Sequence, residues 1–267
     1  MRAAFPTFLI GIALTLSQAH AAGVSLLDDP ALTGANRYER CLVLVKDNAR
    51  NAVAAAEAWH GAGGGAAALH CEALALTALH RFGEAALKLD QAAMIAPGGE
   101  RDLRIALYDQ AGNAWLLAGN PEKAEASIST ALALSPHDED ILFDRARARA
   151  ARKDWSGAET DLTKLLQIDG DRADAWVLRA SARHAEGRRA EAAADIGHAL
   201  AVYPDYPEAL VERGTMKLES GDAAGARADW QTVIHDEPDG DAANAARQRL
   251  AAMAALPPAP PAKPAGK

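Results

Sequence analysis

Between residues 173 and 204, the order of apolar and polar positions predicts two short helices joined by a turn. Trp176 and Ala180 lie four residues apart and therefore share one face of the first helix. Gly187 suits the end of that helix, where positive φ is needed, and Pro204 ends the second helix. A single hairpin of this size cannot bury both of its faces, so we expect the pattern to recur.

The hairpin pattern recurs with a period of thirty-four residues. Three columns carry it: a small residue in the first helix, a small residue opening the second, and a residue that ends the second helix. The members are Ala73, Gly112, Ala146, Ala180 and Gly214; Ala85, Ala124, Ala158, Ala192 and Ala226; and Pro97, Pro136, Gly170, Pro204 and Pro238. In all three columns the first two members are thirty-nine residues apart and later members are thirty-four apart. The difference places a five-residue insertion near residues 98–104.

This repeating helix–turn–helix pattern, with Trp115 and Trp176 in first helices, resembles the tetratricopeptide repeat (TPR) family. It departs from the family at Lys153, where other hairpins have glycine, and at Gly170, which replaces the proline. The resemblance implies an all-α fold, a right-handed superhelical α-solenoid of stacked hairpins. It also implies that the first helices line a concave groove that holds a protein or peptide segment. Fold alone does not identify that partner.

The predicted organisation follows from these columns and from the ends of the chain. The segments are a signal peptide at 1–21, an extended lead-in at 22–37, an atypical first hairpin at 38–65, five repeats within 66–240 (66–99, 105–138, 139–172, 173–206 and 207–240), a capping helix at 241–256 and a disordered proline-rich tail at 257–267. Terminal repeats are expected to be atypical because one side meets water. The tail is either a linker or a docking motif.

The first residues predict export from the cytoplasm. Arg2 precedes an apolar run over residues 5–16, and Ala19, His20 and Ala21 form a small-x-small ending. This order is typical of a secretory signal peptide, here cleaved after Ala21. The alternative, an uncleaved anchor, would need a run of about 20 residues. We therefore expect a periplasmic or secreted chain with no integral membrane span after cleavage.

Charge and residue spacing argue against several classes of function. The chain has 28 Lys+Arg and 36 Asp+Glu, and an acidic protein repels the phosphates of nucleic acid. A metal or enzyme site using His70, Cys71 and His80 is an alternative, but His80 falls at a hairpin turn, and Glu72 lies on a different helix face from His70. We predict no catalytic, metal or cofactor site and no enzymatic activity.

Charged residues also recur with the repeat. In three hairpins an arginine of the first helix precedes an aspartate of the second by sixteen residues: Arg145 and Asp161, Arg179 and Asp195, Arg213 and Asp229. In hairpin 66–99 both charges swap sign, as Glu72 and Lys88, and in hairpin 105–138 both are lost, as Ala111 and Ser127. Joint loss and joint reversal predict salt bridges within each hairpin. A ligand-binding ladder of arginines would not require the acid to follow.

Cys41 and Cys71 are the only cysteines, and both lie in first helices of consecutive hairpins. Stacked hairpins place such helices side by side. An even count in an oxidising compartment favours a disulfide between them. The alternative is two small buried residues without a bond.

The face of each first helix that points away from the apolar contacts is the expected binding groove. It is formed by Asp109, Gln110, Asn113, Asp140, Asp144, Arg147, Asp174, Val177, Ser181, Glu208, Glu212 and Thr215. Most of these charges are negative, so we expect a basic or neutral partner segment. Two alternatives remain: the acids only keep an exposed face soluble, or the chain is a stabilising subunit of an envelope complex that uses its convex face.

Overall fold

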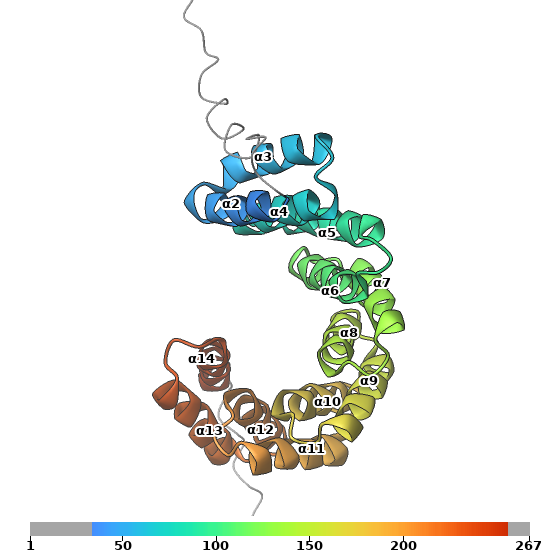
Figure 1. Ribbon diagram of the computed structural model, residues 1–267. Coiled ribbons are helices and arrows are strands. Elements are labelled where there is room, and N and C mark those ends of the chain that lie inside the picture. Colours follow the sequence, from blue (N-terminus) through green and yellow to red (C-terminus); the bar gives the residue numbers. More distant parts are fainter. Residues whose placement is uncertain (1–33, 256–267) are drawn as a thin grey trace, which may run out of the picture. The chain divides into compact units, whose positions relative to one another are not determined.

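The computed structural model describes residues 34–255. The expected signal peptide, most of the lead-in and the proline-rich tail lie outside the described residues. The described part is all-α, with thirteen helices and no strand (Figure 1). The helices are α2 (Gly34–Asp47), α3 (Ala49–Gly61), α4 (Gly65–Ala78), α5 (Phe82–Ile95), α6 (Arg101–Leu117), α7 (Pro121–Leu134), α8 (Glu139–Ala151), α9 (Trp155–Ile168), α10 (Ala173–Ala185), α11 (Arg189–Val202), α12 (Pro207–Glu219), α13 (Ala223–Asp236) and α14 (Asp241–Ala254).

The chain forms two compact units, and the first runs to Gly119. Its described part contains α2 to α6, with α3 packed on α4 and α5 packed on both α4 and α6. Trp59 anchors the core at the start of this unit, among alanines of α3 and α4. Cys41 on α2 and Cys71 on α4 are fully buried and disulfide-bonded, with Cα atoms 6.2 Å apart. The bond therefore joins α2 to α4, which are in direct contact although α3 separates them in the sequence.

The second unit begins at Asn120 and contains α7 to α14. Figure 1 shows α8, α10 and α12 in one layer and α9, α11 and α13 in the other. Trp230 of α13 is the largest side chain of its core and packs with residues of α12 and α14. Leu250 and Met253 of α14 cover that cluster, so α14 packs against the last hairpin by its apolar side.

The small-residue columns lie in the buried interior between helices. Their alanines are fully buried. At Gly214 a Cβ atom would lie 2.5 Å from Nε1 of Trp230, which is closer than real Cβ contacts come. Trp230 is held there by a hydrogen bond from Nε1 to the carbonyl of Val211 at 3.0 Å. A larger residue at Gly214 would therefore push α13 away from α12.

Most hairpin turns of the second unit end the first helix in the left-handed region, which glycine adopts most easily. Gly187 has φ 80° and Gly221 has φ 92°. Lys153 adopts φ 64° at the equivalent place, so the departure from glycine in the sequence leaves the turn unchanged. The second helices of this unit often begin with an aspartate cap, as where Asp154 accepts a hydrogen bond from the amide of Gly157 at 3.0 Å.

Three boundaries differ from the sequence-based prediction. Helix α14 ends at Ala254, before the predicted end of the capping helix at residue 256. Helix α2 begins at Gly34, so residues 34–37 are helical, not extended. Helix α6 begins at Arg101 and has 17 residues, against 13 in α8. The inserted residues thus lengthen the start of α6, because nothing between Arg101 and Ala111 interrupts a helix and Asp102 is favourable in its first turn. Among the described residues, no helix is both long and apolar enough to cross a membrane.

Candidate protein-interaction face

Polar side chains of α8, α10, α12 and α14 are linked by hydrogen bonds and ion pairs on the second unit, and we call this surface the first-helix face. It contains most of the expected groove residues of this unit. It also contains three basic residues outside the expected set, Arg172, His184 and Arg249, which bind the acids directly. The face is therefore a network of paired charges in which acids still outnumber bases.

Arg172, just before α10, joins α8 to α10. It donates from Nη1 to Oδ1 of Asp140 at 3.0 Å, and from Nη2 to Oδ2 of Asp174 at 2.8 Å. Its guanidinium also lies over the ring of Phe143, 5.4 Å from the centroid. Burial raises the pKa of Asp174, but the hydrogen bond from Arg172, the charge of Arg172 and backbone hydrogen bonds together outweigh burial, so the pKa lies below its usual value. The Asp140 side chain stays 83% exposed and available to a partner.

His184 joins α10 to α12. Its Nδ1 lies 2.9 Å from Oε1 of Glu212, and its Nε2 lies 2.9 Å from Oε2 of Glu219. The hydrogen bond to Glu219 is the main reason why the pKa of His184 is raised, with the bond to Glu212 adding to it and burial opposing it. When protonated, the imidazole binds two carboxylates of the next first helix.

Arg249 of α14 extends the network to the last helix. Its Nε donates to Oγ1 of Thr215 at 2.7 Å, and its Nη2 lies 4.0 Å from Oε2 of Glu212. Glu212 thus lies between His184 and Arg249. The cross-helix contacts fix the relative positions of α10, α12 and α14.

The other predicted groove residues have different surroundings. Asp144 pairs with Arg147 on the same helix at 2.8 Å. Val177 is partly buried against the cluster of Ala180 and Ile196, so it contributes to packing more than to an exposed groove. Ser181 is also partly buried, and Glu208 is exposed.

In the first unit, Gln110 of α6 binds His70 of α4, with 3.0 Å between Oε1 and Nε2. Nδ1 of the same His70 lies 2.8 Å from the hydroxyl of Tyr38 on α2. Burial lowers the pKa of His70, and the bond to Gln110 partly opposes that shift. Asn113 donates to the carbonyl of Asp109 within α6. These contacts connect α2, α4 and α6 through one imidazole.

Each aspartate predicted to pair with an arginine sixteen residues earlier does so, and each binds a second cation as well. Arg179 donates two hydrogen bonds to Asp195, at 3.0 and 2.8 Å, and Arg183 adds a third at 2.9 Å. The same arrangement holds Asp161 between Arg145 and Arg149, and Asp229 between Arg213 and Lys217. In the reversed pair, Nζ of Lys88 lies 2.8 Å from Oε1 of the buried Glu72.

The second cation of each set, twelve residues before its aspartate, was missed in the sequence. Arg149, Arg183 and Lys217 recur once per repeat, so the repeat period was the signal that could have found them. Burial raises the pKa of Asp229, but hydrogen bonds from Arg213 and Lys217 overcome it and leave the pKa below its usual value. These sets are internal braces because they lie between the two helices of one hairpin.

The residues considered for a metal or enzyme site do not come together as one. Cys71 is bonded to Cys41, and His70 is bonded to Tyr38 and Gln110. His80 lies at the hairpin turn with φ 56°. Across residues 34–255, no group of three or more His, Cys, Asp or Glu side chains is placed to hold a metal ion.

Comparison with known proteins places the chain among helical repeat proteins. Residues 116–182 match the family model described as tetratricopeptide repeat. No curated protein matches the chain by sequence.

Several solved structures share the fold. YrrB, described as a TPR protein with an unusual peptide-binding site, is 17% identical with a TM-score of 0.58, covering 73% of this chain and 99% of its own. The C-terminal part of a TPR repeat-containing protein from Cytophaga hutchinsonii is 15% identical with a TM-score of 0.61, covering 85% and 92%. MamA from Desulfovibrio magneticus RS-1 is 17% identical with a TM-score of 0.55, covering 66% and 97%. At these identities the likeness concerns the all-α helical repeat fold.

Proposed function

We propose that this chain is a non-catalytic, exported scaffold or adaptor that holds a segment of a partner protein against the first-helix face. The observation that carries the proposal is the network of Arg172, His184 and Arg249. It fixes polar side chains of α8, α10, α12 and α14 before any partner arrives, and a surface ordered in advance loses less entropy on binding. TPR proteins mediate protein–protein interaction, and the peptide-binding site in the description of YrrB agrees with such a role by analogy of fold.

The charge of the face favours a basic or neutral segment as the partner. Acids are in the majority even after pairing: Asp140, Asp144, Asp174, Glu208 and Glu212 stand against Arg147, Arg172 and Arg249, with His184 adding charge when protonated. The exposed Asp140 and Glu208 are the acids best placed to meet lysine or arginine from a partner. Complementary charge of this kind mainly raises the rate and specificity of association.

Periplasmic or secreted location is the second part of the proposal. It is supported by the signal-like order of Arg2, the apolar run and Ala19 to Ala21, and by the disulfide between Cys41 and Cys71. Fractionation of cells followed by N-terminal sequencing tests it. A mature chain that begins at Ala22 in the envelope fraction supports export, and an intact N-terminus in the cytosol would overturn it.

Charge reversal tests the face itself. The double variant D140K/E208K changes two exposed acids of the first-helix layer. The matched control E191K/D236K makes the same charge change on α11 and α13 of the other layer, where both residues are exposed. In crosslinked pull-downs from cells that express the full chain, we expect the first variant to recover at least tenfold less partner than the native chain does. The control should recover as much partner as the native chain. The opposite result would assign binding to the outer layer.

A further inference from the structure

The joint between α11 and α12 differs from the other joints of the second unit. Between α7 and α8, Glu125 binds Arg149 at 2.9 Å and also pairs with Arg152. Between α9 and α10, Glu159 binds Arg183 at 2.8 Å and also pairs with Arg188. In each case one glutamate and two arginines fill the space between consecutive hairpins.

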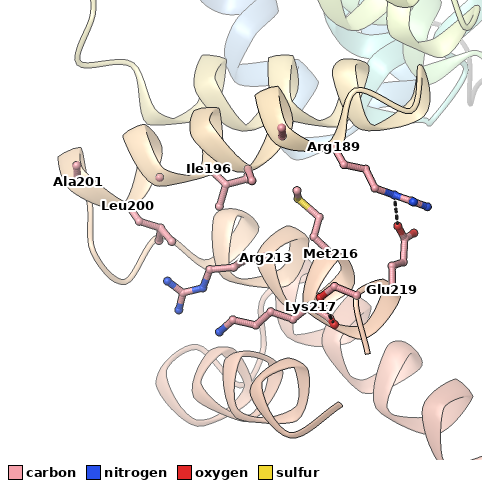
Figure 2. A pocket seen from close by; sticks show the side chains of 12 residues that line it. Arg189, Ile196, Leu200, Ala201, Arg213, Met216, Lys217 and Glu219 are labelled. Atoms are coloured by element: carbon pink, nitrogen blue, oxygen red, sulfur yellow. Dashed lines mark hydrogen bonds and ion pairs between the residues drawn. The ribbon is translucent and has the colours of Figure 1, made fainter. Parts of the chain in front are cut away.

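The third joint has no such filling. Ala193 stands one repeat after Glu159, where the pattern places the glutamate, and Lys217 replaces the arginine. Lys217 turns instead to Asp229, with 2.9 Å between Nζ and Oδ2. Ala193 is consequently exposed, and a cavity of about 780 Å³ opens between the two helices (Figure 2).

The cavity is apolar along its floor. Small residues follow one side of α11 at spacings of three, four and four: Ala190, Ala193, Gly197 and Ala201. A Cβ at Gly197 would meet nothing within 4 Å, so no part of the described chain packs on this side of the helix there. Ile196 and Leu200 of α11 and Met216 of α12 complete the surface. The distance along the helix from Ala190 to Ala201, eleven residues further on, is about 16 Å, enough for three turns of a bound helical segment.

The rim is positive, although the whole chain has a net charge of −8. Arg189, Arg213 and Lys217 line the cavity, with side chains 73%, 40% and 32% exposed. Arg213 and Lys217 share the single carboxylate of Asp229, and Arg189 lies 3.4 Å from Glu219. Three cations thus face two carboxylates. Figure 2 shows Arg213 and Lys217 extending along one side of the opening and Arg189 pairing with Glu219 on the other.

We propose that this α11/α12 cavity is a second docking site, for a short protein segment that combines large apolar side chains with Asp or Glu. The apolar groups fill the floor beside Ala193 and Gly197, and the carboxylates meet the rim cations. The site shares Glu219 with the network of the first-helix face but selects for the opposite charge. The chain's own C-terminal sequence does not match it, because residues 256–267 contain two lysines and no acid.

Selection from a random peptide library tests the site without knowledge of the natural partner. A phage-displayed dodecapeptide library is selected on the immobilised full chain. The enriched peptides are then synthesised and their binding is measured by fluorescence anisotropy. The blocking variant is A193E, which introduces the side chain found at positions 125 and 159 within reach of Lys217 and so is compatible with the repeat. The matched control is A194E, the same change at the next, exposed residue outside the cavity.

We expect a family of enriched peptides with Leu, Ile or Phe beside Asp or Glu. Their affinity falls at least tenfold for A193E and less than twofold for A194E, and R189E weakens them as well. The proposal is overturned if no peptide is enriched, if every enriched peptide binds A193E as tightly as the native chain, or if the peptides sensitive to A193E are basic. Peptides that respond to D140K/E208K but not to A193E report on the first-helix face, so the two proposals can fail separately.

Discussion

Replacing Asp195 with alanine tests whether the buried charge sets hold the hairpins together. Asp195 is 1% exposed and receives three hydrogen bonds from guanidinium groups, two from Arg179 and one from Arg183. In D195A, Arg183 keeps Glu159 as a partner. Arg179, itself only 8% exposed, keeps the hydroxyl of Thr163 at 3.2 Å and the ring of Trp176 at 4.6 Å. Its charge then remains buried beside no carboxylate.

Removing one partner of a buried ion pair typically costs about 3–5 kcal/mol, and we expect D195A to lower the free energy of unfolding by this amount. R179M should lower the free energy of unfolding by about 1–2 kcal/mol less than D195A does, because Asp195 keeps the hydrogen bond from Arg183. The double variant D195A/R179M should lose about 1–3 kcal/mol less than the two single losses added together, since the two residues are in direct contact.

Urea unfolding followed by far-UV circular dichroism measures all three free energies. D205A is the matched control, because Asp205 is exposed in the turn between α11 and α12 and its loss should stay within about 0.5 kcal/mol. If D195A cost no more than D205A, the pair would behave like an exposed surface salt bridge, which contributes only about 0–1 kcal/mol. That result would refute the interpretation of these sets as structural braces.

Four further predictions concern other parts of the fold. C41S/C71S should lower the stability of the first unit by about 3–4 kcal/mol, because the disulfide closes a loop of 30 residues. Thermal unfolding with and without reductant measures this loss, and no loss would show that the bond does not form in solution. G214A should cost about 1–3 kcal/mol through its clash with Trp230, whereas G197A, where nothing lies within 4 Å, should be neutral or stabilising, and equal effects would contradict the packing argument. K153G should stabilise by about 1 kcal/mol, because lysine occupies the left-handed region there, and a loss would show that Lys153 contributes more than its turn. The pKa of His184 is raised in the folded state, so its contribution to folding stability is present below about pH 6.5 and is lost as pH rises through the folded-state pKa. H184Q should therefore flatten the decrease in stability between about pH 6 and 8. An unchanged slope would assign that decrease to another group.

The repeat period made much of the fold predictable. Small residues one period apart, such as Ala146 and Ala180, are fully buried in the structure, and charges sixteen apart, such as Arg179 and Asp195, form pairs within a hairpin. Both features are local, because they need only one hairpin and its copies. Sequence periodicity reports such features directly.

The charge balance of the first-helix face could not be predicted in the same way. Arg172 reaches back to Asp140, and Arg249 reaches Thr215 from the last helix. These contacts join different hairpins at separations that do not repeat, so each helix considered alone appeared acidic. The α11/α12 cavity was missed for a related reason: it results from one alanine, Ala193, in a column that was not followed along the repeats.

Site-specific photocrosslinking most directly tests the claim that partners bind the first-helix face. A photoreactive amino acid replaces the exposed Glu208 of α12 in one variant and the exposed Asp236 of α13 in another, and cells expressing each full chain are irradiated. Adducts are then identified by mass spectrometry. The account predicts a discrete protein adduct from position 208 and none from position 236. An adduct from position 236 alone, or from neither position, would contradict it.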